Sequence, residues 1–200
     1  MTASQTHGFC RVIIPHTLMN PNKLWLTVDS GTVQLLFPNS ELYDNGSHRW
    51  IYLAYPHSTH EIAVVEDSAS PLIENVHQLP PEESVNPVDS VQVYANVTDN
   101  VSGVKRVALN VTLSNGTMFT VEMTNLEGNL YNGTIPQFPY NTDVTYMILA
   151  EDNLNNTSTT SDLGYEYQYT VISEFPTLII LPLFMILSLL AALAYRRRRT

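Results

Sequence analysis

Residues 91–117 read VQVYANVTDNVSGVKRVALNVTLSNGT and contain two runs in which apolar and polar side chains alternate. An alternation with a period of two is typical of a β-strand that buries one face. The pattern predicts strands at 91–98 and 104–114, with inward positions at Val91, Val93, Ala95 and Val97, then at Val107, Leu109, Val111 and Leu113. Asn115-Gly116 predicts a tight hairpin turn into a third strand. The stretch therefore indicates an antiparallel β-sheet.

Runs of the same kind recur on both sides of this stretch, between Leu72 and Ile172. They lie at 72–76, 119–123, 131–135, 144–150 and 165–171, and in the last of them Tyr165, Tyr167, Tyr169 and Val171 share a face. Together the runs make seven strands in about 100 residues, the number and spacing of an immunoglobulin-like or fibronectin-III-like sandwich. The Cys…Trp…Cys pattern of antibody domains is absent. The sequence predicts an all-β sandwich over residues 72–172, of the broader class.

The pattern of residues 1–66 predicts a separate small β module. Its candidate strands are 8–15, 23–29, 32–37, 48–56 and 59–66, with turn signals at Asp29-Ser30-Gly31 and Asp44-Asn45-Gly46. Five strands without a matching start indicate a module that is truncated at its N-terminal side. Residues 67–89 are rich in proline and acidic residues, and we expect a linker there together with the first strand of the sandwich.

Residues 177–195 read TLIILPLFMILSLLAALAY and carry no charge, which predicts one transmembrane helix. The four residues that follow, Arg196, Arg197, Arg198 and Arg199, form a basic tail within 196–200. Arginine clusters remain on the cytoplasmic side of a membrane. We therefore expect residues 1–174 to be extracellular and the C-terminus to be cytoplasmic. A tail-anchored protein that faces the cytoplasm is the alternative, and it opposes this charge rule.

The charge of the chain is strongly acidic outside the tail. Nineteen Asp and Glu residues face nine Lys and Arg residues, and four of those nine are the tail arginines. The remaining surface would repel phosphate backbones, which argues against a nucleic-acid partner. Cys10 is the only cysteine, so an intrachain disulfide is excluded and a structural thiol is the simplest interpretation. No nucleophile elbow, phosphate-binding glycine loop or paired-carboxylate motif is present, and we predict no enzymatic activity.

Eight asparagines begin an Asn-x-Ser/Thr triplet, the acceptor motif for N-glycosylation. They are Asn45, Asn96, Asn100, Asn110, Asn115, Asn132, Asn155 and Asn156. The predicted strand registers place Asn96, Asn110 and Asn132 on polar faces, and the others in turns. The triplets predict a glycosylated outer surface, although a composition rich in asparagine and threonine also produces such triplets by accident.

Acidic and amide side chains occur in loops that a sandwich brings together. Asp99-Asn100 and Glu151-Asp152-Asn153 lie in the second-to-third and sixth-to-seventh loops, which share one end of the fold, and Glu66-Asp67 enters there. Oxygen ligands at that end could hold Ca²⁺ between the modules, with Asp99 and Asp152 as candidate ligands. The opposing interpretation is that Asp and Asn are simply favoured in turns. No complete calcium-binding loop is present, and no other cofactor is indicated.

The chain resembles archaeal cell-surface proteins in three segments. Ser173-Glu174-Phe175-Pro176, followed by an apolar span and arginines, is similar to the PEF-type sorting signal that archaeosortases process, although its usual first residue is proline. VTDNVSGVKRVALNVTLSNGT (97–117) and LAEDNLNNTS (149–158) resemble Ig-like repeats of archaeal exported proteins. GFCRVIIPHTL (8–18) through YLAYPHSTHEIAVV (52–65) resembles a small β module found beside such repeats. The resemblance implies cleavage near the sorting motif of Glu174, Phe175 and Pro176 (within 173–176), and attachment to a lipid.

Two functional hypotheses follow from the sequence. The first is a membrane-anchored, glycosylated surface protein whose sandwich is a spacer or adhesion module, with lipid, a processing enzyme and a surface protein or glycan as partners. The second is the anchoring C-terminal part of a larger exported enzyme or solute receptor. Residues 1–16 lack a basic region and an apolar core, so they are not a signal peptide. We therefore expect either a longer product or a start that lies upstream of Met1.

Overall fold

A computed structural model describes residues 7–29, 33–34, 40–56, 59–172 and 184–190. The small unit, residues 7–66, contains two three-stranded antiparallel sheets. One sheet has the order β1-β5-β4, with β1 at His7–Pro15, β5 at His48–Pro56 and β4 at Ser40–Asp44. The other has the order β3-β2-β6, with β3 at Val33–Gln34, β2 at Leu24–Val28 and β6 at Ile62–Glu66.

The core of the small unit is built from the inward positions of both sheets. Ile14, Ile51 and Leu53 are buried, and the partly buried side chains of Cys10, Val12, Met19, Leu24, Leu26, Ile62 and Val64 pack on them. Cys10 thus contributes to packing, as a structural thiol does. The strand β4 was not predicted, because SELYD is short and mostly polar. The Asp44-Asn45-Gly46 turn between β4 and β5 is confirmed by the hydrogen bond from Gly46 N–H to Asp44 Oδ1 (2.7 Å).

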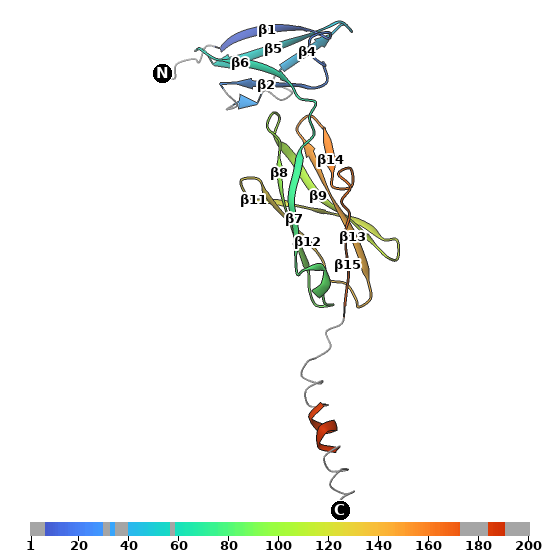
Figure 1. The fold of residues 1–200 in the computed structure, drawn as a ribbon. Helices are drawn as coiled ribbons and strands as arrows, with labels where there is room; N and C mark the ends of the chain where they lie inside the picture. The colour runs from blue at the N-terminus through green and yellow to red at the C-terminus, as the bar shows by residue number, and fades with distance from the viewer. Residues whose placement is uncertain (1–6, 30–32, 35–39, 57–58, 173–183, 191–200) are drawn as a thin grey trace, which may run out of the picture.

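Residues 72–170 form a sandwich of two antiparallel sheets below the small unit (Figure 1). The first sheet has the order β11-β12-β8-β7, from Thr124–Glu127, Leu130–Ile135, Val91–Thr98 and Leu72–Leu79. The second has the order β10-β9-β13-β14, from Met118–Glu122, Val104–Leu113, Asp143–Asp152 and Thr157–Thr159, with β15 (Tyr167–Thr170) also paired to β13. A short 3₁₀ helix, η1, spans Glu82–Ser84. This division of strands is that of an Ig-like sandwich.

The strand registers predicted for 91–98 and 104–114 are confirmed. Every inward position of β8 is at most 1% exposed, and Val107, Leu109 and Val111 of β9 are buried as well. Strands β9 and β13 pair antiparallel in one sheet through nine positions, from Val144↔Leu113 to Asp152↔Val104. Burial of Tyr146 raises the pKa of its phenol, and its hydroxyl donates to Gln78 Oε1 (2.8 Å). The period-two pattern therefore determines which side chains fill the core.

Two strands of the sandwich were not predicted. β10 covers most of the predicted run at 119–123, and after the buried Met123 the chain continues in the other sheet as β11. β15 lies within the predicted run at 165–171, and β14 precedes it as an additional strand, so nine strands take the place of the predicted seven within 72–170. Tyr165 is 62% exposed and lies outside β15, which corrects its assignment to the inward face. It follows the turn at Gly164, whose φ is +83°.

The C-terminal predictions fall largely outside the described residues. The sorting motif 173–176, the arginines Arg196 to Arg199 and most of the predicted span 177–195 belong to this group. Residues 184–190 are helical and exposed. Within the residues that the structure describes, no helix has both the length and the apolar character needed to cross a membrane.

Gly133 allows close contact between the two sheets of the sandwich. A Cβ at this position would lie 2.8 Å from Leu109 Cδ1 and 2.9 Å from Met123 Cγ. We expect Gly133→Ala to lower the free energy of unfolding by about 1–3 kcal/mol, because overpacking displaces core side chains. Chemical denaturation followed by circular dichroism measures this change. Thr134→Ala, at the next, exposed position of β12, is the control, and an equal effect of both variants would contradict the role assigned to Gly133.

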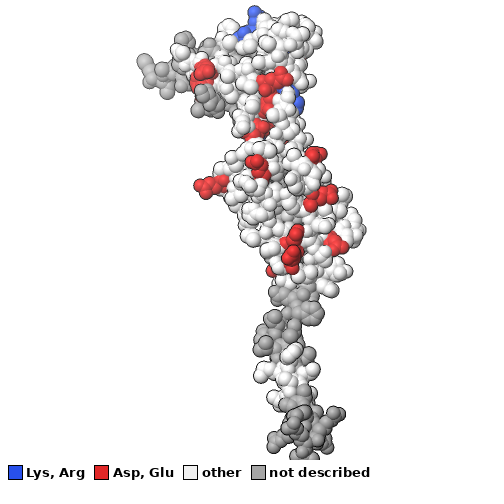
Figure 2. All heavy atoms as spheres, viewed as in Figure 1, with Lys and Arg blue, Asp and Glu red and all other residues white. Residues whose placement is uncertain are grey.

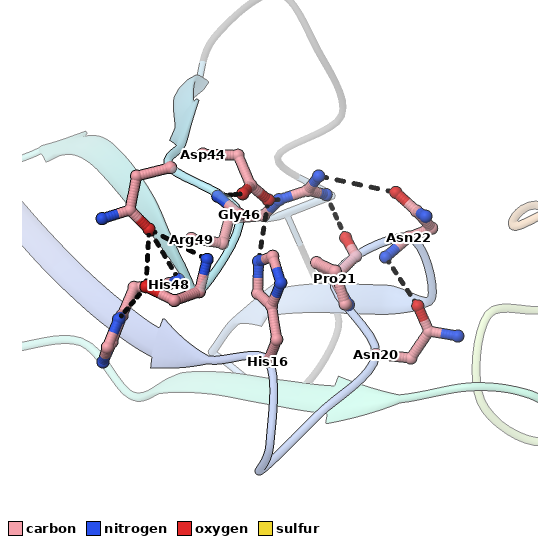
Figure 3. A network of polar contacts seen from close by, with 10 residues as sticks. His16, Asn20, Pro21, Asn22, Asp44, Gly46, His48 and Arg49 are labelled. Atoms are coloured by element: carbon pink, nitrogen blue, oxygen red, sulfur yellow. Dashed lines mark hydrogen bonds and ion pairs between the residues drawn. The ribbon is translucent and has the colours of Figure 1, made fainter.

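A polar network joins the loop after β1 to the β4–β5 hairpin in the small unit (Figure 3). Asp44 Oδ2 accepts hydrogen bonds from Arg49 Nε (3.0 Å) and lies 3.0 Å from His16 Nε2. Arg49 also donates to Pro21 O. The Gly46 N–H, aided by Arg49 and His16, lowers the pKa of Asp44 from its usual 3.8. A second acid, Asp29, has its pKa lowered chiefly by the hydrogen bond with His60.

The lowered pKa of Asp44 predicts acid sensitivity of the small unit. A carboxyl group with a lowered folded-state pKa stabilises the fold above its unfolded pKa, and this stabilisation is lost as the pH falls through the folded value. We expect the melting temperature to fall when the pH is lowered below about 3.8, and to fall less in the Asp44→Asn variant. Because Trp25 and Trp50 are the only tryptophans, fluorescence melting reports on this unit. The control Glu61→Gln should behave like the parent, and an identical acid profile for Asp44→Asn would contradict the prediction.

Candidate metal site at the junction of the two β units

Asp67 connects the small unit to the sandwich through the chain and through hydrogen bonds. It follows β6 directly and is 1% exposed. Its N–H donates to Lys23 O (2.8 Å), which lies just before β2. Its carboxylate accepts hydrogen bonds from Ala69 N–H (3.2 Å, to Oδ1) and from Ser102 N–H (3.1 Å, to Oδ2). One side chain therefore joins the linker to the β8–β9 loop.

Asp99 and Asp152 each organise one loop at this end of the sandwich. Asp99 Oδ1 accepts hydrogen bonds from Val101 N–H (3.1 Å) and Gly103 N–H (2.6 Å) in the β8–β9 loop. Asp152 is fully buried, and its Oδ1 accepts from Leu154 N–H (2.8 Å) and Asn156 N–H (2.7 Å) in the β13–β14 loop. These bonds fix the direction of both carboxylates without a charged partner.

The carboxylates of Asp67, Asp99 and Asp152 converge. One oxygen from each lies within 4.8 Å of the others. Oxygen ligands of a single Ca²⁺ lie about 2.4 Å from the ion, so ligands on opposite sides are about 4.8 Å apart. At an effective dielectric constant of about 20, two carboxylates at this distance repel by roughly 3 kcal/mol. No ion pair within the described residues involves any of the three. The arrangement is chemically suited to a hard cation.

Lys23 and Asn156 add a second connection across the junction. Lys23 Nζ donates to Leu154 O (3.2 Å) and to Asn156 Oδ1. Asn156 Nδ2 donates to Asp67 O (3.0 Å) and to Asp152 Oδ2 (2.6 Å). The ammonium group of Lys23 is thus directed at an amide and a carbonyl rather than at the carboxylates. The side chain of Lys23 in the small unit thus bonds to the β13–β14 loop, and Asn156 of that loop bonds in turn to the linker.

The two calcium ligands predicted from the sequence, Asp99 and Asp152, are brought together, and Asp67 completes the group. The neighbouring acids have other partners. Glu151 forms an ion pair with Lys105 (2.7 Å), and Glu66 accepts a hydrogen bond from Asn20 N–H (3.1 Å). Asn153 binds the backbone carbonyls of Ser102 (2.8 Å) and Gly103 (3.1 Å) and so connects the two loops. The structural roles of Lys23 and Asn156 were not predicted, because 133 residues separate them in the chain.

Most asparagines of the glycosylation triplets lie at the surface of the described chain. Asn45, Asn100, Asn115 and Asn155 are exposed, and Asn96, Asn110 and Asn132 are half-buried on outward faces. Asn156 is the exception, at 8% exposed. Both of the hydrogen bonds donated by its Nδ2 are internal, so this nitrogen is not available to a glycan. We therefore expect no glycan at Asn156 in the folded protein, in contrast to the prediction from its triplet.

The acidic character extends over the surface. On the face that Figure 2 shows, Asp and Glu side chains are visible along both units, while Lys and Arg appear only toward the small-unit end. An excess of negative charge on a surface raises the local concentration of cations near it.

No family model matches the chain, and no curated protein matches it. Solved structures with some similarity include a Br derivative of BhCBM56, at 13% identity over 48% of this chain and 99% of that one, TM-score 0.33. A chimeric titin Z1Z2 carrying an exogenous KLER peptide from decorin shows 16% identity over 86% and 100%, TM-score 0.34. A DUF4785 family protein from Legionella pneumophila shows 13% over 85% and 56%, TM-score 0.35. At these values the similarities carry no inference about function.

The junction predicts how the overlapping triplets at Asn155 and Asn156 are used. We expect Asn155→Gln to abolish glycosylation of this loop although the Asn156-Thr-Ser triplet is intact, because the Asn156 amide is buried and bonded. Glycopeptide mass spectrometry of the protein from its native host measures the occupancy. Asn115→Gln, a change in the distant β9–β10 turn, is the control and should leave the loop glycan in place. A glycan on Asn156 in the folded protein would contradict the structure.

Proposed function

We propose that this chain is a membrane-anchored, N-glycosylated surface protein whose β-sandwich acts as a spacer that presents the small unit away from the membrane. The observation that carries the proposal is the junction. Linker and loops are joined there by hydrogen bonds that Lys23 and Asn156 donate and that the Asp67 carboxylate accepts from Ser102 N–H. A spacer requires such a connection, because units joined only by a free linker would not keep a fixed separation.

The place where the chain leaves the sandwich supports a small unit that points away from the membrane. The described chain runs from β15 to the end of the sandwich opposite the small unit (Figure 1). The apolar stretch 177–195 and the arginine tail follow in the sequence. With the tail in the cytoplasm, the small unit would be the part farthest from the membrane. Removal of the span at the Glu174-Phe175-Pro176 motif, with transfer to a lipid, belongs to the same proposal.

An adhesion role is favoured by the outer face of the β1-β5-β4 sheet. Cross-strand pairing places apolar and aromatic residues on one face there, through Ile13↔Trp50 and Tyr43↔Trp50. Phe9 is 82% exposed and Tyr43 is 61% exposed. A surface of this kind is typical of contact with another protein or domain. The same face also supports the second candidate function, in which the chain anchors a larger exported enzyme or receptor.

Protease treatment of intact cells tests the topology. We expect added proteinase K to degrade the part of the chain before residue 173 and to leave the C-terminal peptide in the membrane, because the arginine tail fixes the orientation. An antibody against residues 114–118, in the exposed β9–β10 turn, follows the digestion. Lysed cells are the control for accessibility.

Protection of residues 1–172 in intact cells would contradict the surface location. Intact-mass analysis of the membrane fraction then separates the two forms of anchoring. A mass that ends near Pro176 supports processing, and a full-length mass rejects it while leaving the transmembrane anchor.

A further inference from the structure

Besides the three carboxylates, the junction contains the buried hydroxyl group of Ser102. Ser102 is 1% exposed, and its Oγ has no hydrogen-bond partner among the described residues. Buried hydroxyl groups nearly always have a partner, because leaving one unpaired costs free energy. Ser102 is also the residue whose N–H binds Asp67 Oδ2 (3.1 Å).

The position of this hydroxyl relates it to the carboxylate cluster. Because the Ser102 N–H donates to Asp67 Oδ2, the Ser102 hydroxyl belongs to the same buried junction as that carboxylate. A neutral hydroxyl oxygen is the kind of further donor that hard cations bind together with carboxylates. The unpaired hydroxyl is therefore an observation at the junction that does not depend on the acids themselves.

We propose that Asp67, Asp99 and Asp152 bind one Ca²⁺, which fastens the small unit to the sandwich. Each residue comes from a different segment: the linker, the β8–β9 loop and the end of β13. An ion held by all three connects the linker to this loop and to β13 at once. The part of this inference that concerns fastening rests on the proposed spacer function, whereas the binding of the ion does not.

The chemistry of the donors selects the class of ion. All side-chain donors are oxygens, and a set without nitrogen or sulfur suits Ca²⁺ or Mg²⁺ rather than zinc or copper. Carboxylates that come from three separate segments and differ in their hydrogen bonding suit Ca²⁺, which accepts irregular geometry, better than Mg²⁺, which requires a regular octahedron. Three carboxylates supply at least three of the six to eight oxygens that Ca²⁺ takes, and carbonyl groups and water supply the rest.

Lys23 does not take the place of the ion. Its Nζ is bound to Leu154 O and Asn156 Oδ1, and it forms no ion pair within 4.0 Å of the three carboxylates. The amide of Asn156 lies between the ammonium group and Asp152, to which it donates at 2.6 Å. A cation on the carboxylate side and the ammonium group on the amide side are therefore compatible.

Calcium titration of the full-length chain in detergent micelles tests the binding. After treatment with EDTA, we expect the melting temperature to rise with added CaCl₂, with half-saturation between about 10⁻⁴ and 10⁻³ M, the range of extracellular modules. Asp99→Asn should raise the half-saturating concentration about tenfold or more while leaving the melting temperature in EDTA close to that of the parent, because it is the least buried ligand. Glu127→Gln, an exposed acid of β11 without a hydrogen bond from its side chain, is the matched control and should bind as the parent does.

Several results would overturn the proposal. The absence of any calcium response in the parent, or an unchanged response in Asp99→Asn, rejects the site. An equal response to MgCl₂ rejects the assignment to calcium. Proteinase K cleavage at the exposed linker residues Ser68, Ala69 and Ser70 tests the fastening separately. Calcium should slow this cleavage at least tenfold, and binding without protection keeps the site but rejects its role as a fastener. Neither outcome depends on whether the protein is found at the cell surface.

Discussion

The hydrogen bonds of Asp67 are the interaction on which the arrangement of this molecule depends. Its backbone N–H is held by Lys23 of the small unit, its carbonyl by Asn156, and its carboxylate by Ser102 of the sandwich. Because the residue is buried, water does not compete for these bonds, and each is costly to break without a replacement. A single position in a short linker thereby determines how two independently packed β units are connected.

Each unit is stabilised by its own alternating strands, and the loops at the shared end are left to carry the connection. The sandwich core is filled by apolar side chains, many of them β-branched, together with Tyr146 and Tyr169. At the junction, Asn153, Asn156 and Asp152 bind backbone and side-chain groups of the neighbouring segments. The strands thus position the loops that carry the candidate site.

The sequence was sufficient for the parts of the fold that depend on local pattern. The registers of β8 and β9 follow from the alternation of apolar and polar residues, because a shift by one position would bury Asn96 and Asn110. The additional strand β11 was not predictable, since TNLE is exposed along its whole length and shows no alternation of buried and exposed positions. Likewise Asp99 and Asp152 could be placed at one end by strand count, but the burial of Asn156 could not. Its triplet is identical in kind to those of exposed asparagines, and the contacts with Lys23, Asp67 and Asp152 distinguish it.

The connection between the two units is fixed, and measuring the distance between a probe on each unit tests this directly. Spin labels at Leu18→Cys and Met118→Cys, both strongly exposed, place one probe on each unit of the full-length chain in a Cys10→Ser background. Double electron–electron resonance in the presence of calcium should give one narrow distribution of the distance between the labels. A broad distribution that spans many distances would show that the units move independently, and it would contradict the central claim.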